Sequence, residues 1–223
     1  MPTVIYYSNN ILDEGIQYYC LKNLEQAARF HSEIITVSWE PLPLEVGTRR
    51  IVTGQKEMSH KSIYEQILMG LEYVSPVETV ALAEHDVLYH LNHFEMGCYQ
   101  SRKEPKKFCY SSNVVHLTKE GFAKAQPVPF LSTLVARADV LAEGIRRKLV
   151  ELETTGQIQW AEPTAPEGPA FFASSIEIID IRHDTNFTIP YLNNNYYERS
   201  PYWGLANDIW KRIDDSRPTI EMG

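Results

Sequence analysis

The sequence predicts an α/β protein in which a mostly parallel central sheet is flanked by helices. Over roughly the first 90 residues, short runs of β-branched and aromatic residues alternate with longer segments of helical periodicity. One of these runs, TVALA at residues 79–83, is almost wholly apolar, which is typical of a strand covered on both faces. Strands and helices that alternate in this way form parallel sheets.

The elements of the first half follow in order along the chain. Strands are predicted at residues 3–7, 33–39 and 77–83, with a short strand or extended segment at 51–54. Helices are predicted over residues 13–30 and 60–74, where apolar residues such as Ile63 and Ile67 recur at helical spacing. Ser62 and Glu65 form a possible capping box at the start of the second helix.

The pattern changes after residue 95. Residues 107–118 are expected to form one or two strands broken near 111–113, followed by a proline-containing loop. A helix is predicted over residues 132–151, a loop over 162–170, a strand over 174–182 and a short helix near 204–213. No internal repeat or low-complexity segment divides the chain.

Composition and charge narrow the class of protein. The 223 residues suit one domain, and 43% hydrophobic with 22% charged residues is normal for a globular protein. The net charge of -8 argues against nucleic-acid binding by the chain as a whole. Basic clusters at residues 101–108 and 146–148 leave a local patch open.

The sequence contains no segment that predicts a membrane or secreted protein. No run approaches the ~20 apolar residues needed to cross a bilayer, and the start MPTVIYYSNN lacks the pattern of a signal peptide. Three cysteines, Cys20, Cys98 and Cys109, are an odd number at no metal-binding spacing, so no disulfide framework is expected. We therefore expect a cytoplasmic protein with no membrane partner.

Polar residues follow three predicted strands at the point where each strand ends. Ser8, Asn9 and Asn10 follow the first strand, Glu84-His85-Asp86 follows TVALA, and His183 follows the strand at 174–182. Ligands bind outside the carboxyl ends of strands in open parallel sheets, so these ends are expected to converge on one crevice.

The acidic residues in this set predict a metal site. Alternate residues of an extended segment point the same way, so Glu84 and Asp86 are expected to face one cation, with His183 completing the ligands. Oxygen ligands suit Mg²⁺ or Mn²⁺, and these ions bind diphosphates.

The segments SNN, residues 60–74 and ALAEHDVLYHLNHF resemble GT-A-fold, Rossmann-like glycosyltransferases, in particular small family-two-like members of bacteria and phages. In that family a short Asp-x-Asp motif ends a central strand and holds a metal with the nucleotide diphosphate. Here the motif reads Glu84-His85-Asp86, with glutamate at the first position. The segment IDIRHDTNFT resembles the late strand of such enzymes, and His183 matches a histidine that joins the metal or the diphosphate. The resemblance covers residues 3–95 and, more loosely, 174–204.

This resemblance implies a single domain over residues 1–223, with a nucleotide-sugar half at 1–95 and an acceptor half at 96–223. It implies transfer of a sugar from a nucleotide-sugar donor, with a UDP-sugar expected, to a hydroxyl group. Asp86 becomes the main metal ligand and catalytic residue, and Ser8, Asn9 and Asn10 lie beside the nucleotide with Glu84 and His85. His60 and Lys61 approach the donor phosphates at a helix start.

The acceptor side is expected in the second half. Candidates for a catalytic base are Asp139 and, on the late strand, Glu177 and Asp180. His93, Tyr202 and Trp203 are expected near the acceptor. The acceptor itself is either a saccharide or small hydroxyl compound or a hydroxymethylated pyrimidine in phage DNA, which would place the protein in the host cytoplasm.

Other functions are left open. His85, His90 and His93 with Asp86 could form a zinc cluster for hydrolysis, although their spacing lacks HExxH or HxH. A carbohydrate- or nucleotide-binding module without turnover, and a metal-dependent hydrolase, are further alternatives. The sequence has neither GxGxxG after the first strand nor a GxxxxGK[ST] motif, which argues against dinucleotide and P-loop enzymes.

Overall fold

The computed structural model describes residues 2–28, 33–125, 128–158, 162–163, 165, 167–184, 186 and 195–217. Its main sheet has seven strands in the order β10-β6-β9-β4-β1-β2-β3. Their bounds are β1 Thr3–Ser8, β2 Ile34–Ser38, β3 Arg49–Val52, β4 Thr79–Glu84, β6 Phe108–Ser111, β9 Leu134–Arg137 and β10 Pro169–Phe172. Neighbouring strands run parallel except at β9, which is antiparallel to both β4 and β6. The mostly parallel sheet predicted from the sequence is therefore confirmed.

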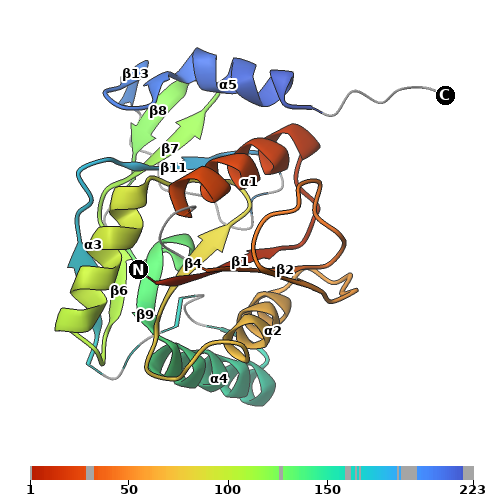
Figure 1. Cartoon of the computed structure of the whole chain (residues 1–223), viewed down its shortest axis with the longest axis vertical. Coiled ribbons are helices and arrows are strands. Elements are labelled where there is room, and N and C mark those ends of the chain that lie inside the picture. Colours follow the sequence, from red (N-terminus) through yellow and green to blue (C-terminus); the bar gives the residue numbers. More distant parts are fainter. Residues whose placement is uncertain are drawn as a thin grey trace.

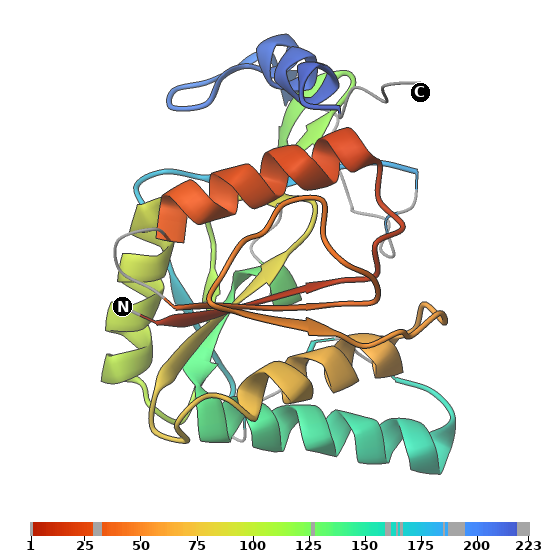
Figure 2. The same ribbon diagram turned by 45° about the vertical axis from the view of Figure 1, so that its right-hand side comes forward.

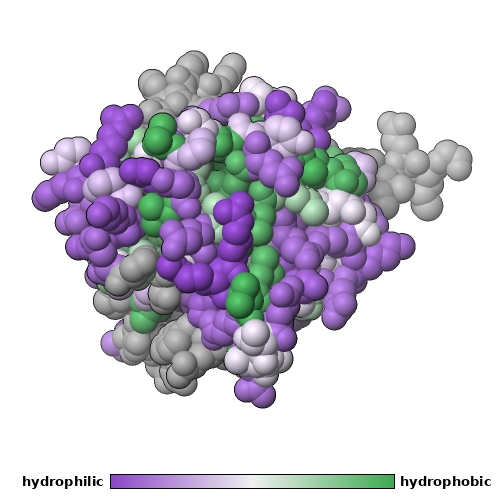
Figure 3. Space-filling model, turned by 90° about the horizontal axis from the view of Figure 1, so that it is seen from below, coloured by the Kyte–Doolittle hydropathy of each residue, from purple (hydrophilic) through white to green (hydrophobic). Residues whose placement is uncertain are grey.

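Helices cover both faces of this sheet (Figures 1 and 2). The helices α1 (Glu14–Ala28) and α3 (Leu91–Lys103) lie on one face, and α2 (His60–Leu71) and α4 (Ala138–Thr155) lie on the other. Strand β1 shows why two helical layers are needed. Its side chains alternate, so Val4 and Tyr6 enter the core under α1 and α3 while Ile5 and Tyr7 enter the core under α2 and α4. The face seen from below, on the side of α2 and α4, is mostly hydrophilic, with apolar side chains exposed in patches (Figure 3).

A second sheet lies beyond α1, in the order β12-β8-β7-β11-β5. Its strands are β5 Val87–Leu88, β7 Val114–Thr118, β8 Gly121–Lys124, β11 Ile178–Ile181 and β12 Tyr196–Tyr197. Helix α5 (Ala206–Asp215) packs on this sheet through Ile209 and Ile213, and Ile16 and Cys20 of α1 join the same core. A short hairpin, β13 (Arg199–Ser200) with β14 (Gly204–Leu205), precedes α5. No helix within the described ranges is long and apolar enough to cross a membrane.

The structure differs from the sequence prediction in several elements. The helix expected at 132–151 begins only at residue 138, because residues 134–137 pair as β9 between β4 and β6. No helix was predicted at residues 91–103, which form α3, and β8 was not foreseen. Strand β10 begins at residue 169, within the loop expected at 162–170, because it pairs in parallel with β6. The capping box at α2 is formed by Ser59 and Ser62 instead of Ser62 and Glu65, since the helix begins at His60. The break predicted near 111–113 does separate two strands, β6 and β7.

Candidate active site

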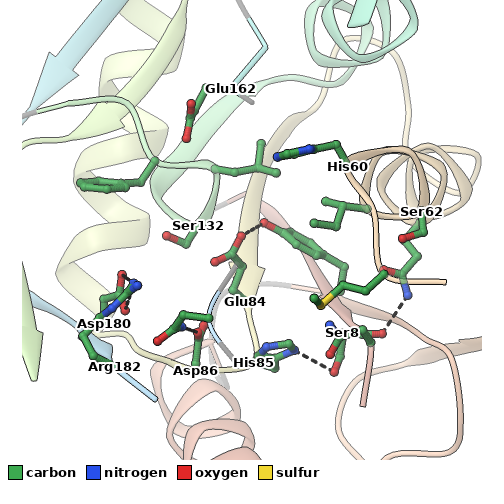
Figure 4. Close-up of a pocket in the computed structure, with 18 residues that line it drawn as sticks. Ser8, His60, Ser62, Glu84, His85, Asp86, Ser132, Glu162, Asp180 and Arg182 are labelled. Carbon is green, nitrogen blue, oxygen red and sulfur yellow. Dashed lines mark hydrogen bonds and ion pairs between the residues drawn. The ribbon is translucent and has the colours of Figure 1, made fainter. Parts of the chain in front are cut away.

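A polar cavity lies where the carboxyl ends of three strands meet. Tyr7 of β1 pairs with Glu84 of β4, and the backbone N–H of Ile181, at the end of β11, donates to the carbonyl of Asp86 at 2.8 Å. Figure 4 shows Asp180 and Arg182 on one side of the cavity and Ser62, from the start of α2, on the other. The cavity volume is about 120 Å³, below the roughly 300 to 1,000 Å³ of typical small-molecule pockets, so only part of a nucleotide-sized ligand fits inside it.

Three side chains form a possible metal site, two of them in the cavity wall and the third, His183, outside it. His85, Asp86 and His183 each bring one ligand atom to within 4.8 Å of the others. His183 Nε2 lies 3.1 Å from Asp86 Oδ2, and the amide of Asn186 donates to the same oxygen at 2.8 Å. His85 turns its Nδ1 toward Ser8 Oγ at 3.0 Å, which leaves its Nε2 as the ligand nitrogen.

The electrostatics of this cluster suit a cation. Burial alone would raise the pKa of Asp86, but the hydrogen bond with His183 and the charges of His85, His183 and Arg182 outweigh burial and lower it. Burial lowers the pKa of His85. An ionised carboxylate beside a neutral imidazole is the protonation state that binds a metal ion, so these residues fit a divalent cation.

Glu84 does not join this cluster. Strand β4 ends at Glu84 and the chain turns at residues 85–86, so the extended alternation expected for Glu84 and Asp86 stops before Asp86. The hydroxyl of Tyr7 donates to Glu84 Oε1 instead. Burial and the neighbouring charge of Asp86 raise the pKa of Glu84 to about 8.

The other residues predicted beside the nucleotide are divided between the cavity and its surroundings. Ser8, Asn9 and His60 line the cavity. Asn10 has a positive φ of 56° and bonds to the backbone of Glu40, which fixes the loop behind Ser8. Lys61 is exposed and lies 3.9 Å from Glu65, outside the cavity wall.

A buried charged network adjoins the cavity and was not foreseen as a unit. Arg182 Nη1 lies 3.3 Å from both carboxylate oxygens of Asp180, and His116 Nδ1 lies 3.3 Å from Asp180 Oδ2. The His116 contact lacks hydrogen-bond geometry, so we treat it as electrostatic only. The available sequence signal was a titratable residue inside each of two otherwise largely apolar strands, His116 in VVHLT and Asp180 in IIDI. In register, His116 stands directly opposite Asp180.

Two candidates for a catalytic base lie away from the cavity. Asp139 lies two residues after Arg137, which stands opposite Thr79 at the beginning of β4. This places Asp139 at the edge of the sheet opposite Asp86, where its carboxylate forms an ion pair with the Arg137 guanidinium. Glu177 precedes β11, and its carboxylate accepts from the Ser200 hydroxyl. Neither lines the cavity.

The three residues expected near the acceptor are also outside the cavity wall. His93 is fully buried among the rings of Tyr89, Phe94 and Phe172. Tyr202 and Trp203 contact each other edge to face at 5.0 Å and line a separate hollow beside α1. The alternative zinc cluster is not assembled in the part of the chain that the structure describes, since His90 caps α3 and is not in the group with His85.

The fold and the position of the site define a class: a GT-A-like, Rossmann-like α/β fold with a polar site at the carboxyl edge of its parallel strands. No family model and no curated protein sequence matches the chain.

Comparison with solved structures finds proteins of similar fold. The chain resembles 2-C-methyl-D-erythritol 4-phosphate cytidylyltransferase from Francisella tularensis, with a TM-score of 0.51 and 11% identity over 78% of this chain and 91% of that one. It also resembles the galactosyltransferase LgtC in complex with donor and acceptor sugar analogs, with a TM-score of 0.47 and 13% identity over 77% and 73% of the two chains. The fold assignment depends on the first, and both likenesses concern the fold alone.

Proposed function

We propose that the protein is a metal-dependent glycosyltransferase that moves a sugar from a nucleotide-sugar donor to a hydroxyl group. The observation that carries the proposal is the cluster of His85, Asp86 and His183 at the carboxyl edge of the parallel strands. This is the edge where open α/β sheets bind ligands. A cluster of two imidazoles and one ionised carboxylate is suited to hold a cation beside a phosphate group.

The charges of the cavity wall support a metal-dependent reaction. Among the described residues that line it, Arg182 is the only guanidinium and there is no lysine, whereas Asp86, Glu162 and Asp180 are acidic; Glu84, with a pKa of about 8, is mostly protonated at neutral pH. These side chains cannot neutralise a departing nucleoside diphosphate by themselves. A divalent ion at His85, Asp86 and His183 would supply the missing positive charge to that leaving group.

The ligand types bear on which metal binds. Mg²⁺ prefers oxygen ligands in octahedral geometry, whereas two of the three ligands here are imidazole nitrogens. We therefore propose Mn²⁺ ahead of Mg²⁺ as the ion that supports activity.

A second candidate function is nucleotidyl transfer, which the fold of the Francisella tularensis cytidylyltransferase favours. That reaction would bring a nucleoside triphosphate, with more negative charge than a nucleotide sugar, into a wall whose described part has one guanidinium and four acidic side chains, of which Glu84 is mostly protonated at neutral pH. The wall suits the less charged ligand, and we therefore place glycosyl transfer first.

The first experiment measures nucleoside diphosphate release from a panel of nucleotide sugars, with Mn²⁺ or with EDTA. We expect release from one donor, which EDTA abolishes and Mn²⁺ restores ahead of Mg²⁺. A parallel panel of nucleoside triphosphates, with pyrophosphate as the product, tests the second function. Release that is unaffected by EDTA would remove the metal from the proposal, and no product in either panel would favour a binding module.

Glu162 is our candidate for the base in an inverting transfer. It lines the cavity, whereas Asp139 and Glu177 do not, and burial raises its pKa. A carboxylate with a raised pKa accepts a proton more readily near neutral pH. We expect Glu162→Gln to lower kcat by about 10²-fold or more with little change in donor KM. Asp139→Gln serves as the distant control, and an unchanged kcat in Glu162→Gln would exclude this role.

A further inference from the structure

A larger hollow adjoins the cavity on the far side of Arg182. We call it the α5 groove; it has a volume of about 750 Å³, and its walls include Lys119, Arg182, His183, Asp184, Trp210 and Arg217. Arg182 lines both spaces, and His183 in the groove wall contacts Asp86 of the cluster at 3.1 Å. The groove and the metal cluster are thus separated by no more than one layer of side chains.

The groove offers one aromatic ring among many hydrogen-bonding groups. Trp210 lines the groove and is held in place because its indole N–H donates to the carbonyl of Thr118 at 2.9 Å. Asp184 and Asn207 contribute carboxylate and amide groups to the same wall. A sugar has C–H faces that pack on an aromatic ring and hydroxyl groups that pair with carboxylates and amides, so this combination suits it.

The charges of the groove argue against a polyanion. Four carboxylates, Asp13, Glu120, Asp184 and Asp214, line it with three cationic side chains. One of these cations, Arg217, already pairs with Asp13 at 3.2 Å and with Asp214 at 3.4 Å. DNA binding depends on cations that meet phosphates, and this wall provides few.

The basic cluster at 101–108 is also in the wrong place for a DNA acceptor. It ends where β6 begins, and β6 runs in the same direction as β4 because both are antiparallel to β9. The cluster therefore lies at the edge of the sheet opposite Asp86. This cluster therefore provides no cations beside the metal cluster for the phosphates of a DNA acceptor.

We propose that the α5 groove binds the acceptor and that this acceptor is an uncharged saccharide, with Trp210 as its stacking residue. This inference rests on the proposed glycosyl transfer and replaces Tyr202 and Trp203 as the acceptor contacts. The proposed arrangement holds the body of the acceptor on the groove side of Arg182 and His183, with its reacting hydroxyl entering the cavity where the donor and Glu162 would lie.

The test compares two tryptophans in the same chemical setting. Trp203, like Trp210, donates its indole N–H to a backbone carbonyl at 2.9 Å, but it lines the hollow beside α1. Saturation-transfer NMR would measure binding of methyl glycosides of glucose, galactose, mannose and N-acetylglucosamine to wild type, Trp210→Ala and Trp203→Ala. A hydroxymethylcytosine oligonucleotide is the DNA probe. The conservative variants Trp210→Phe and Asp184→Asn keep the test decisive if Trp210→Ala does not fold.

We expect a glycoside to bind the wild-type protein, and Trp210→Ala to weaken that binding about tenfold, with less than about twofold change in Trp203→Ala. Trp210→Phe should retain most of the affinity and Asp184→Asn should lose part of it. Equal losses in both alanine variants, binding of the oligonucleotide alone, or no glycoside bound would overturn the inference. Because binding is measured without turnover, these results are independent of nucleoside diphosphate release, whose absence would instead remove the proposed function.

Discussion

Replacing Asp86 with asparagine is expected to lower kcat/KM for sugar transfer by about 10²- to 10³-fold, the cost typical of removing one electrostatic stabiliser from an active site. Asparagine keeps the shape of the side chain and can still bond to His183 and Asn186, which contact Asp86 at 3.1 and 2.8 Å. It lacks the negative charge that attracts a divalent cation between His85 and His183. We therefore expect the activating concentration of Mn²⁺ to rise at least about tenfold as well.

The control for this variant makes the same chemical change elsewhere. Asp139→Asn removes a carboxylate at the opposite edge of the sheet, where its partner is Arg137. Its kcat/KM should stay within about twofold of the wild-type value, as expected for a surface ion pair remote from the reaction. Thermal unfolding of both variants separates a catalytic loss from a loss of folded protein. If Asp86→Asn is folded and has wild-type activity and metal dependence, Asp86 is not a metal ligand.

The first half of the fold could be predicted because its signals are local. Strands β1, β2 and β4 are short apolar or β-branched runs that end in polar residues, and α1 and α2 have clear helical periodicity. Strand β3, RRIV, begins two residues before the segment expected at 51–54, because it starts with two arginines and not with an apolar run. Parallel pairing follows from that alternation without knowledge of distant partners. The register of β1 with β4, which places Tyr7 beside Glu84, is an outcome of this pairing.

Strand β9 could not be predicted in the same way. Residues 134–137, LVAR, continue into the helical pattern of α4, and local propensity alone extends the helix through them. They form a strand because β4 and β6 leave a position between them that β9 fills by antiparallel pairing. This is a tertiary effect that overrides local preference.

The site was predictable where it depends on strand ends and not where it depends on side-chain partners. Ser8 ends β1, His85 and His183 follow β4 and β11, and the structure brings the three together around Asp86. The roles assigned to these residues remain predictions. The pairing of Tyr7 with Glu84 depends on register between distant strands and on rotamers, for which one sequence carries no signal. Asp180 and Arg182, by contrast, are two residues apart and lie on the same side of one extended segment.

A buried histidine is expected to make the protein sensitive to mild acid. His93 has 0% exposure, and neither of its ring nitrogens has a hydrogen-bond partner within the described part of the chain. Burial lowers the pKa of His93 from 6.5 to about 3. Because the pKa of His93 is lower in the folded than in the unfolded protein, protons bind the unfolded state preferentially between pH 6.5 and about 3. The free energy of unfolding therefore keeps its full value above pH 6.5 and decreases as the pH falls from 6.5 toward 3. Within that window each pH unit removes about 1.4 kcal/mol of unfolding free energy.

The substitution His93→Phe tests this account, because phenylalanine keeps an aromatic ring among Tyr89, Phe94 and Phe172 but cannot bind a proton. Between pH 6.5 and pH 5.0 the wild-type protein should lose about 2 kcal/mol more unfolding free energy than the variant, as measured by urea denaturation at each pH. Any packing cost of the larger ring affects both pH values equally and cancels in this difference. His60→Phe is the control, since His60 is only partly buried and should flatten the pH dependence much less. Parallel pH profiles for wild type and His93→Phe would show that His93 is protonated, or reached by water, in the folded protein.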